Sequence, residues 1–144
     1  MTEQQPQRLD EVLCAEIACA QAMLAALERE QQALLAGEHG ALDEARAEKD
    51  RLTAELEALE QRRLLLEASA GQRPAAGPEQ GHWQTLLALI GDCRERTRRN
   101  GALLGARRES VAVVLRSLRG TGPEPYGANG REAPSGGGRP LASA

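Results

Sequence analysis

The chain has 144 residues, a net charge of −3, no phenylalanine, one tryptophan and one tyrosine. This length suits a single domain, and its core has to be built from leucine, alanine, valine and isoleucine, which favours closely packed helices over a sheet or a deep pocket. Three cysteines, an odd number, do not form a disulfide framework and fit a reducing compartment. Because the N-terminus lacks a basic start followed by an apolar run, and no apolar stretch has membrane-spanning length, we expect a cytoplasmic protein without a signal peptide.

The first helix is expected over residues 7–36. Its apolar residues recur at helical spacing and form one stripe, which comprises Leu9, Leu13, Ile17, Ala20, Leu24, Leu27 and Leu34. The helix should end at Gly37-Glu38-His39-Gly40, where two glycines permit a tight turn. So short a connection predicts that the next helix runs antiparallel to the first.

The second helix, expected over residues 41–69, carries the most regular pattern in the chain. Its stripe steps by threes and fours through Leu42, Ala45, Lys49, Leu52, Leu56, Leu59, Arg63 and Leu66. Asp43 and Glu44 should lie in its first turn, where the helix dipole favours negative charge. Lys49 and Arg63 should reach solvent along their long stems. Such a helix gains most of its stability from packing, so partner helices must cover the stripe.

A linker rich in proline and glycine, residues 71–81, precedes a third helix expected over residues 82–118. The stripe of this helix comprises Trp83, Leu86, Leu87, Ile90, Cys93, Thr97, Leu104, Val111, Leu115 and Leu118. Asn100-Gly101, followed by Gly105, predicts either a kink or a patch of small residues that another backbone could approach. Residues 120–144 are rich in glycine and proline and should form a flexible, disordered tail. The predicted fold is therefore all-α: residues 1–119 form a coiled-coil-like bundle of three long antiparallel helices, and the tail follows.

Catalysis and metal binding have little support in the sequence. The two histidines, His39 and His82, are far apart, and no Cys-His spacing matches a zinc site. Cys14 and Cys19 are five residues apart and do not share one helix face. The glycines form no phosphate-binding loop. We therefore predict no enzyme, no catalytic residue, no cofactor and no metal.

Nucleic-acid binding is a stronger alternative because the third helix is rich in arginine. The residues concerned are Arg94, Arg96, Arg98, Arg99, Arg107 and Arg108. Arginine binds phosphate well, but the whole chain is acidic, acidic residues separate these arginines, and no aromatic side chains accompany them. We expect these arginines to face water and the acidic first two helices, and we expect no nucleic-acid partner.

The last part of the third helix has more apolar residues than one stripe requires. Leu103, Val113 and Val114 lie off the stripe that Leu104, Val111, Leu115 and Leu118 continue. If the first two helices leave this end uncovered, it presents an apolar patch that suits an amphipathic partner helix. The alternatives are that the domain's own fold or a second copy of the chain, in a homodimer, covers it. Tyr126, the one aromatic residue of the tail, could serve as a short docking element.

Several features, in this order, resemble the flagellar export chaperone family of the FlgN type. The N-terminal helix carries Leu24, Leu27, Glu30 and Leu34, and the helix after the break carries Leu42 and Lys49. Trp83 opens the last helix, which contains Asn100-Gly101-Ala-Leu-Leu, and a Tyr-Gly-x-x-Gly segment follows at Tyr126–Gly130. The last two motifs are the most specific part of the resemblance.

This resemblance implies a cytoplasmic, non-enzymatic chaperone. Such a protein binds the C-terminal helical segments of hook-filament junction (hook-associated) proteins, prevents their premature assembly and delivers them to the flagellar type III export gate. The resemblance assigns client binding to Leu103, Leu104, Val111, Val114, Leu115 and Leu118, and export-gate docking to Tyr126. A structural coiled-coil or scaffold protein without a secretion role remains an alternative, as does the arginine-mediated nucleic-acid binder.

Overall fold

The computed structural model describes residues 4–71, 73–74, 77 and 79–120, and these residues form three helices and no strand. Helix α1 spans Gln4–Ala36, α2 spans His39–Ala70 and α3 spans Gln80–Leu118. The predicted all-α class with three long helices is confirmed. The chain divides into two compact units, residues 1–104 and 105–144, each of which is described by itself.

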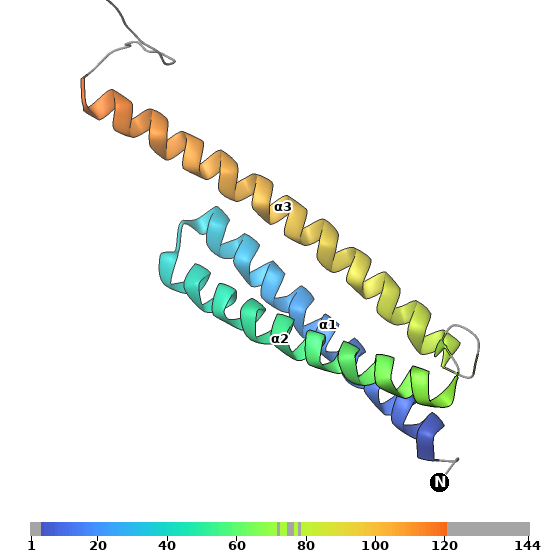
Figure 1. The fold of residues 1–144 in the computed structure, drawn as a ribbon. Coiled ribbons are helices and arrows are strands. Elements are labelled where there is room, and N and C mark those ends of the chain that lie inside the picture. Colours follow the sequence, from blue (N-terminus) through green and yellow to red (C-terminus); the bar gives the residue numbers. More distant parts are fainter. Residues whose placement is uncertain (1–3, 72, 75–76, 78, 121–144) are drawn as a thin grey trace, which may run out of the picture. The chain divides into compact units, whose positions relative to one another are not determined.

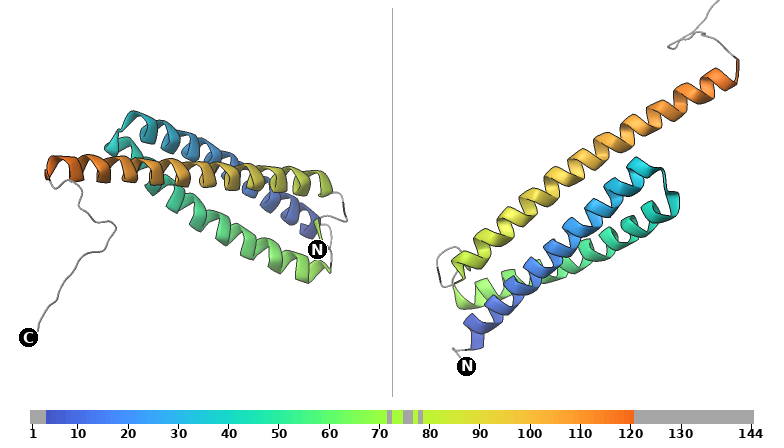
Figure 2. Two further views of the ribbon diagram at one scale, coloured as in Figure 1. Left: turned by 90° about the horizontal axis from the view of Figure 1, so that it is seen from above. Right: turned by 180° about the vertical axis from the view of Figure 1, so that it is seen from behind.

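In the first unit the helices run up, down and up, and α3 packs parallel to α1 (Figures 1 and 2). Leu86 near the start of α3 packs with Leu9 and Leu13 near the start of α1. Farther along both helices, the Cys93 thiol lies 3.6 Å from the carbonyl oxygen of Ala20. The bundle therefore brings together the beginnings of two helices that are about 70 residues apart in the sequence.

The turn between α1 and α2 is tighter than the sequence suggests. Gly37 has a φ of 72°, a left-handed conformation that glycine adopts without steric cost, and the Glu38 N–H donates to the Ala33 carbonyl at 3.0 Å. Helix α1 ends just before the predicted break, and α2 begins at His39, two residues before the predicted start at residue 41, so Gly40 is helical. For the same reason Asp43 and Glu44 lie beyond the first turn.

The stripe predicted for α2 is confirmed, because every one of its eight residues is buried or half-buried. Helix α1, in contrast, buries more than the one predicted stripe. A second row of buried side chains lies beside it and comprises Val12, Cys19, Met23, Ala26 and Ala33. The reason is that α1 packs against both α2 and α3, so two of its faces are covered rather than one.

On α3 the buried face differs in part from the prediction. Leu87 and Thr97 were expected in the stripe, but both are exposed. Leu89 is half-buried, and Asn100 is buried in spite of its polar side chain. The amide of Asn100 therefore requires hydrogen-bond partners inside the bundle.

Asn100 finds these partners on α1. Its Nδ2 donates to the Leu27 carbonyl and to Glu30 Oε1, both at 2.9 Å. Glu30 is buried and also accepts hydrogen bonds from Lys49 Nζ of α2, at 3.0 Å to each carboxylate oxygen. One polar network thus joins all three helices and opposes sliding of α3 along α1, since a shift would leave buried polar groups without partners.

A second polar network corrects the prediction that Arg63 reaches solvent. Arg63 is buried, and its Nε donates to the buried Glu16 at 2.9 Å while Nη1 donates to Glu67 at 2.8 Å. Its guanidinium also lies 4.7 Å from the ring centroid of Trp83. The stem of an arginine permits exposure, but a carboxylate on the facing helix holds this one inside. Burial raises the pKa of Glu16, although Arg63 lowers it.

Candidate functional site

The last turns of α3 carry a face of exposed apolar side chains. Val111, Val114, Leu115 and Leu118 occupy positions i, i+3, i+4 and i+7, so they lie on one side of the helix. Their exposed fractions are 52%, 55%, 47% and 77%. We call these four residues the α3 stripe. Water-exposed valine and leucine at this spacing form a surface suited to an amphipathic helix.

Charged residues accompany the α3 stripe. Between Gly105 and Gly120 the chain has four arginines and one acidic residue, Glu109, so this segment is basic although the whole chain is acidic. Nη2 of Arg116 lies 3.7 Å from Oε1 of Glu109. Val113 is also exposed, next to the stripe. An apolar strip with basic neighbours favours a partner that combines apolar residues with acidic ones.

The other residues predicted to contact a client are placed differently. Leu103 and Leu104 are half-buried and belong to the unit that contains the helical bundle, residues 1–104. Tyr126, predicted to dock at the export gate, and the predicted tail from residue 121 onward lie outside the described residues. The two leucines lie three and four residues after the buried Asn100.

The structure also tests the two interpretations of Gly101 and Gly105. Helix α3 continues through both, so neither glycine interrupts it. A Cβ atom added at either position would meet nothing within 4 Å. Within the described part of the chain, no backbone from outside the helix therefore comes close to α3 at these glycines.

Arg98 and Arg99 form hydrogen bonds within their own helix. Glu95 accepts hydrogen bonds from Arg98 at 2.7 Å and from Arg99 at 2.9 Å. These bonds lower the pKa of Glu95 to about 2, so the carboxylate is ionised at neutral pH and neutralises part of the basic surface. This arrangement disfavours phosphate binding at Arg98 and Arg99.

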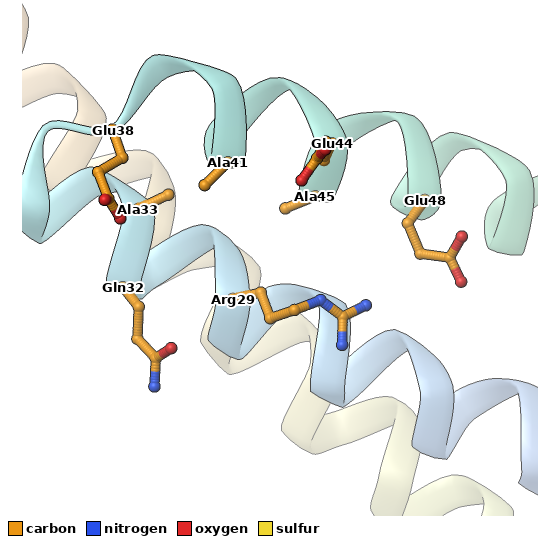
Figure 3. Close-up of a pocket in the computed structure, with 8 residues that line it drawn as sticks. All are labelled: Arg29, Gln32, Ala33, Glu38, Ala41, Glu44, Ala45 and Glu48. Carbon is orange, nitrogen blue, oxygen red and sulfur yellow. The ribbon is translucent and has the colours of Figure 1, made fainter.

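A shallow groove lies where α1 and α2 meet near their connecting turn (Figure 3). Its walls combine small residues with charged and polar ones: Arg29, Gln32, Ala33, Glu38, Ala41, Glu44, Ala45 and Glu48. Hydrogen bonds from Arg51 lower the pKa of Glu48. None of these eight lining residues is a histidine or a cysteine.

The structure brings together one cluster of potential metal ligands that the sequence does not predict. Asp10 and Cys14 on α1 and His82 on α3 place their ligand atoms within 4.8 Å of one another. His82 is 72 residues from Asp10 in the sequence, so no local spacing motif exists. The topology predicts that these residues are close, because in an up-down-up bundle the beginnings of the first and third helices lie at the same end.

Among the described residues, no helix is long and apolar enough to cross a lipid bilayer. Comparison with known proteins gives a match to one family, described as FlgN protein, over residues 1–134. No curated protein and no solved structure matches the chain. The family match covers nearly the whole chain. The chain belongs to the FlgN family and is a flagellar export chaperone of that type.

Proposed function

We propose that this chaperone acts in the cytoplasm, where it binds the C-terminal helical segments of hook-filament junction proteins through the α3 stripe. It thereby prevents their premature assembly and delivers them to the export gate. The observation that carries the proposal is the row of four exposed apolar side chains on α3. Membership of the FlgN family supports a flagellar protein as the client.

The spacing of the α3 stripe fits a helical client. Residues 111, 114, 115 and 118 follow the i, i+3, i+4, i+7 pattern by which one helix packs on another. A terminal helix that is destined for a filament exposes its own apolar stripe until it assembles, so a temporary coiled-coil partner suits it. Burial of ~600 Å² of apolar surface would give roughly 15 kcal/mol before the costs of association and ordering. Those costs leave a moderate affinity, which permits release.

The charge of the segment sharpens the expected client. Because four arginines and one glutamate lie between residues 105 and 120, a client helix with acidic residues beside its apolar stripe is favoured. Exposed charge pairs contribute little to affinity, so this preference should affect mainly the association rate and its dependence on salt.

Leu103 and Leu104 remain proposed client contacts, and Tyr126 remains the proposed docking element for the export gate. A lone tyrosine provides a large contact area with little loss of conformational entropy. Its proposed role predicts that Tyr126→Ala weakens binding to an export-gate component and leaves client binding unchanged.

The test is to mix the full chain with C-terminal peptides of junction proteins and to measure binding by calorimetry. Val114→Asp and Leu118→Asp should abolish binding, because each places a charge in the apolar contact, while helicity by circular dichroism should stay unchanged. Leu65→Asp is the matched control, since Leu65 is 70% exposed but lies on α2. Unchanged binding by both stripe variants would refute the proposed surface.

The same measurements separate the alternatives. A scaffold that uses the α3 stripe for self-association would ignore the peptides, and Leu118→Asp would convert its dimer to a monomer. A nucleic-acid binder would be retained on heparin at low salt and would be released steeply as salt is added.

A further inference from the structure

We propose that Asp10, Cys14 and His82 form a Zn²⁺ site that joins the beginning of α1 to the beginning of α3. The site is distinct from the α3 stripe and does not depend on client binding. Its three side chains come from two helices and supply a carboxylate, a thiol and an imidazole, all of which are common zinc ligands.

The geometry of the two helices creates the cluster. Asp10 and Cys14 are four residues apart and therefore lie one turn apart on the same face of α1. His82 lies in the first turn of α3, and its Nδ1 is 2.6 Å from Asp10 Oδ1. The Cys14 sulfur completes a group of ligand atoms that all lie within 4.8 Å of one another.

These distances fit a tetrahedral metal ion after small side-chain rotations. Zinc–ligand bonds of about 2.0–2.3 Å hold neighbouring ligand atoms roughly 3–4 Å apart. The side chains have room for such rotations, because Cys14 and His82 are exposed and Asp10 is half-buried. Three protein ligands leave the fourth position for water.

The packing beneath the cluster makes it a defined site rather than a chance meeting of mobile side chains. Leu9 and Leu13 of α1 are buried and pack in one cluster with Leu86 of α3, one turn beyond His82. The backbones that carry the three ligands are therefore held in place by the core. Preorganised ligands lose less conformational entropy when a metal binds.

A hydrogen bond between His82 and Asp10 is the simpler explanation of their contact, but it does not account for the nearby Cys14 sulfur. A thiol beside an imidazole–carboxylate pair is the feature that selects a thiophilic ion such as Zn²⁺ over Mg²⁺ or Ca²⁺.

Zinc at this position would crosslink α1 and α3. It would tie the first turn of α3 to α1 and thereby hold the third helix against the α1–α2 hairpin. Because zinc binds the folded bundle better than the unfolded chain, it should raise the midpoint of thermal unfolding, and the increase should depend on zinc concentration.

The test uses Co²⁺ as a spectroscopic substitute for Zn²⁺ in the full, reduced chain. We expect stoichiometric binding with the intense visible absorption of tetrahedral cobalt and a thiolate-to-cobalt charge-transfer band, both abolished by added Zn²⁺. Cys14→Ser should remove the charge-transfer band, and Asp10→Asn and His82→Gln should each weaken binding by about tenfold or more. His39→Gln, which alters the other histidine, should bind like the unmodified chain.

Three further measurements protect the test against a folding defect or a nonspecific site. Circular dichroism should show unchanged helicity in each variant, and zinc should protect Cys14 from alkylation while the thermal shift disappears in Cys14→Ser. A pale octahedral spectrum, or equal affinities for the unmodified chain, Cys14→Ser and His82→Gln, would overturn the proposed site. Neither result would bear on client binding, which the α3 stripe variants test separately.

Discussion

Residues 80–104 and 105–118 belong to one continuous helix, yet their apolar residues have opposite environments. Leu86 in the first part is 1% exposed, whereas Leu118 in the second is 77% exposed. The spacing of apolar residues is similar in both parts. Helical periodicity therefore predicts that a face is made to be covered, but not whether the chain itself or another protein covers it.

The largest loss of stability is expected when the buried Arg63–Glu16 pair of the bundle is disrupted. Arg63→Ala should cost about 3–5 kcal/mol of unfolding free energy, because it leaves the buried carboxylate of Glu16 without its partner. The measurement is urea unfolding followed by circular dichroism. Arg51→Ala is the control: Arg51 is an exposed arginine of the same helix, paired with Glu48 and Glu55, and its removal should change stability very little. Equal effects of the two variants would contradict the buried network.

Paired leucine truncations compare the two regions directly. Leu27→Ala should destabilise the protein by about 2–5 kcal/mol, since Leu27 is 1% exposed and its removal leaves a cavity. Leu118→Ala should change the stability of the free protein by less than about 0.5 kcal/mol. It should instead weaken the client complex. A large loss of stability in Leu118→Ala would mean that this side chain belongs to a core.

The buried amide of Asn100 provides the third test. Asn100→Leu should cost about 1–3 kcal/mol, because it removes the donor to the Leu27 carbonyl and to Glu30 inside the bundle. Thr97→Ala on the same helix should be nearly neutral, since Thr97 is exposed and bonds only one turn back, to the Cys93 carbonyl. The denaturant midpoints of the two variants are compared. An unchanged midpoint for Asn100→Leu would show that this network does not fix the register of α3 against α1.

The burial of polar residues such as Arg63 and Asn100 could not be predicted from the sequence. The α2 stripe could be predicted in full because period and burial coincide along it. The same reasoning placed Arg63 in solvent and Thr97 in the core, because hydrophobicity patterns do not show which buried polar groups find partners on another helix. Val111, Leu115 and Leu118 of the α3 stripe were identified from their spacing, whereas Val114 was placed beside that row, and the exposure of all four required coordinates. The Asp10–Cys14–His82 cluster required the topology.

The pH dependence of stability should carry the signature of Glu16. Burial raises the pKa of this carboxyl from its ordinary value of 4.5, so the folded protein binds the proton more tightly than the unfolded chain. The contribution of Glu16 to stability is therefore fully present below about pH 4.5 and falls as pH rises through the raised pKa. Urea midpoints measured across this range should show that Glu16→Gln removes the decline. An unchanged profile would show that Glu16 titrates normally.

The smallest expected effect separates local helix stability from global stability. Gly105 lies in helical conformation with open space around it, so Gly105→Ala should favour the helix locally by up to about 1 kcal/mol. Hydrogen exchange should slow in residues 105–118, while the urea midpoint of the bundle stays nearly constant, because the substitution touches no core side chain. Gly71→Ala is the opposite control, since Gly71 has a φ of 63° and alanine is strained there. If Gly105→Ala instead moved the global midpoint as much as Leu27→Ala does, the end of α3 would unfold together with the bundle, and the two regions would be one cooperative unit.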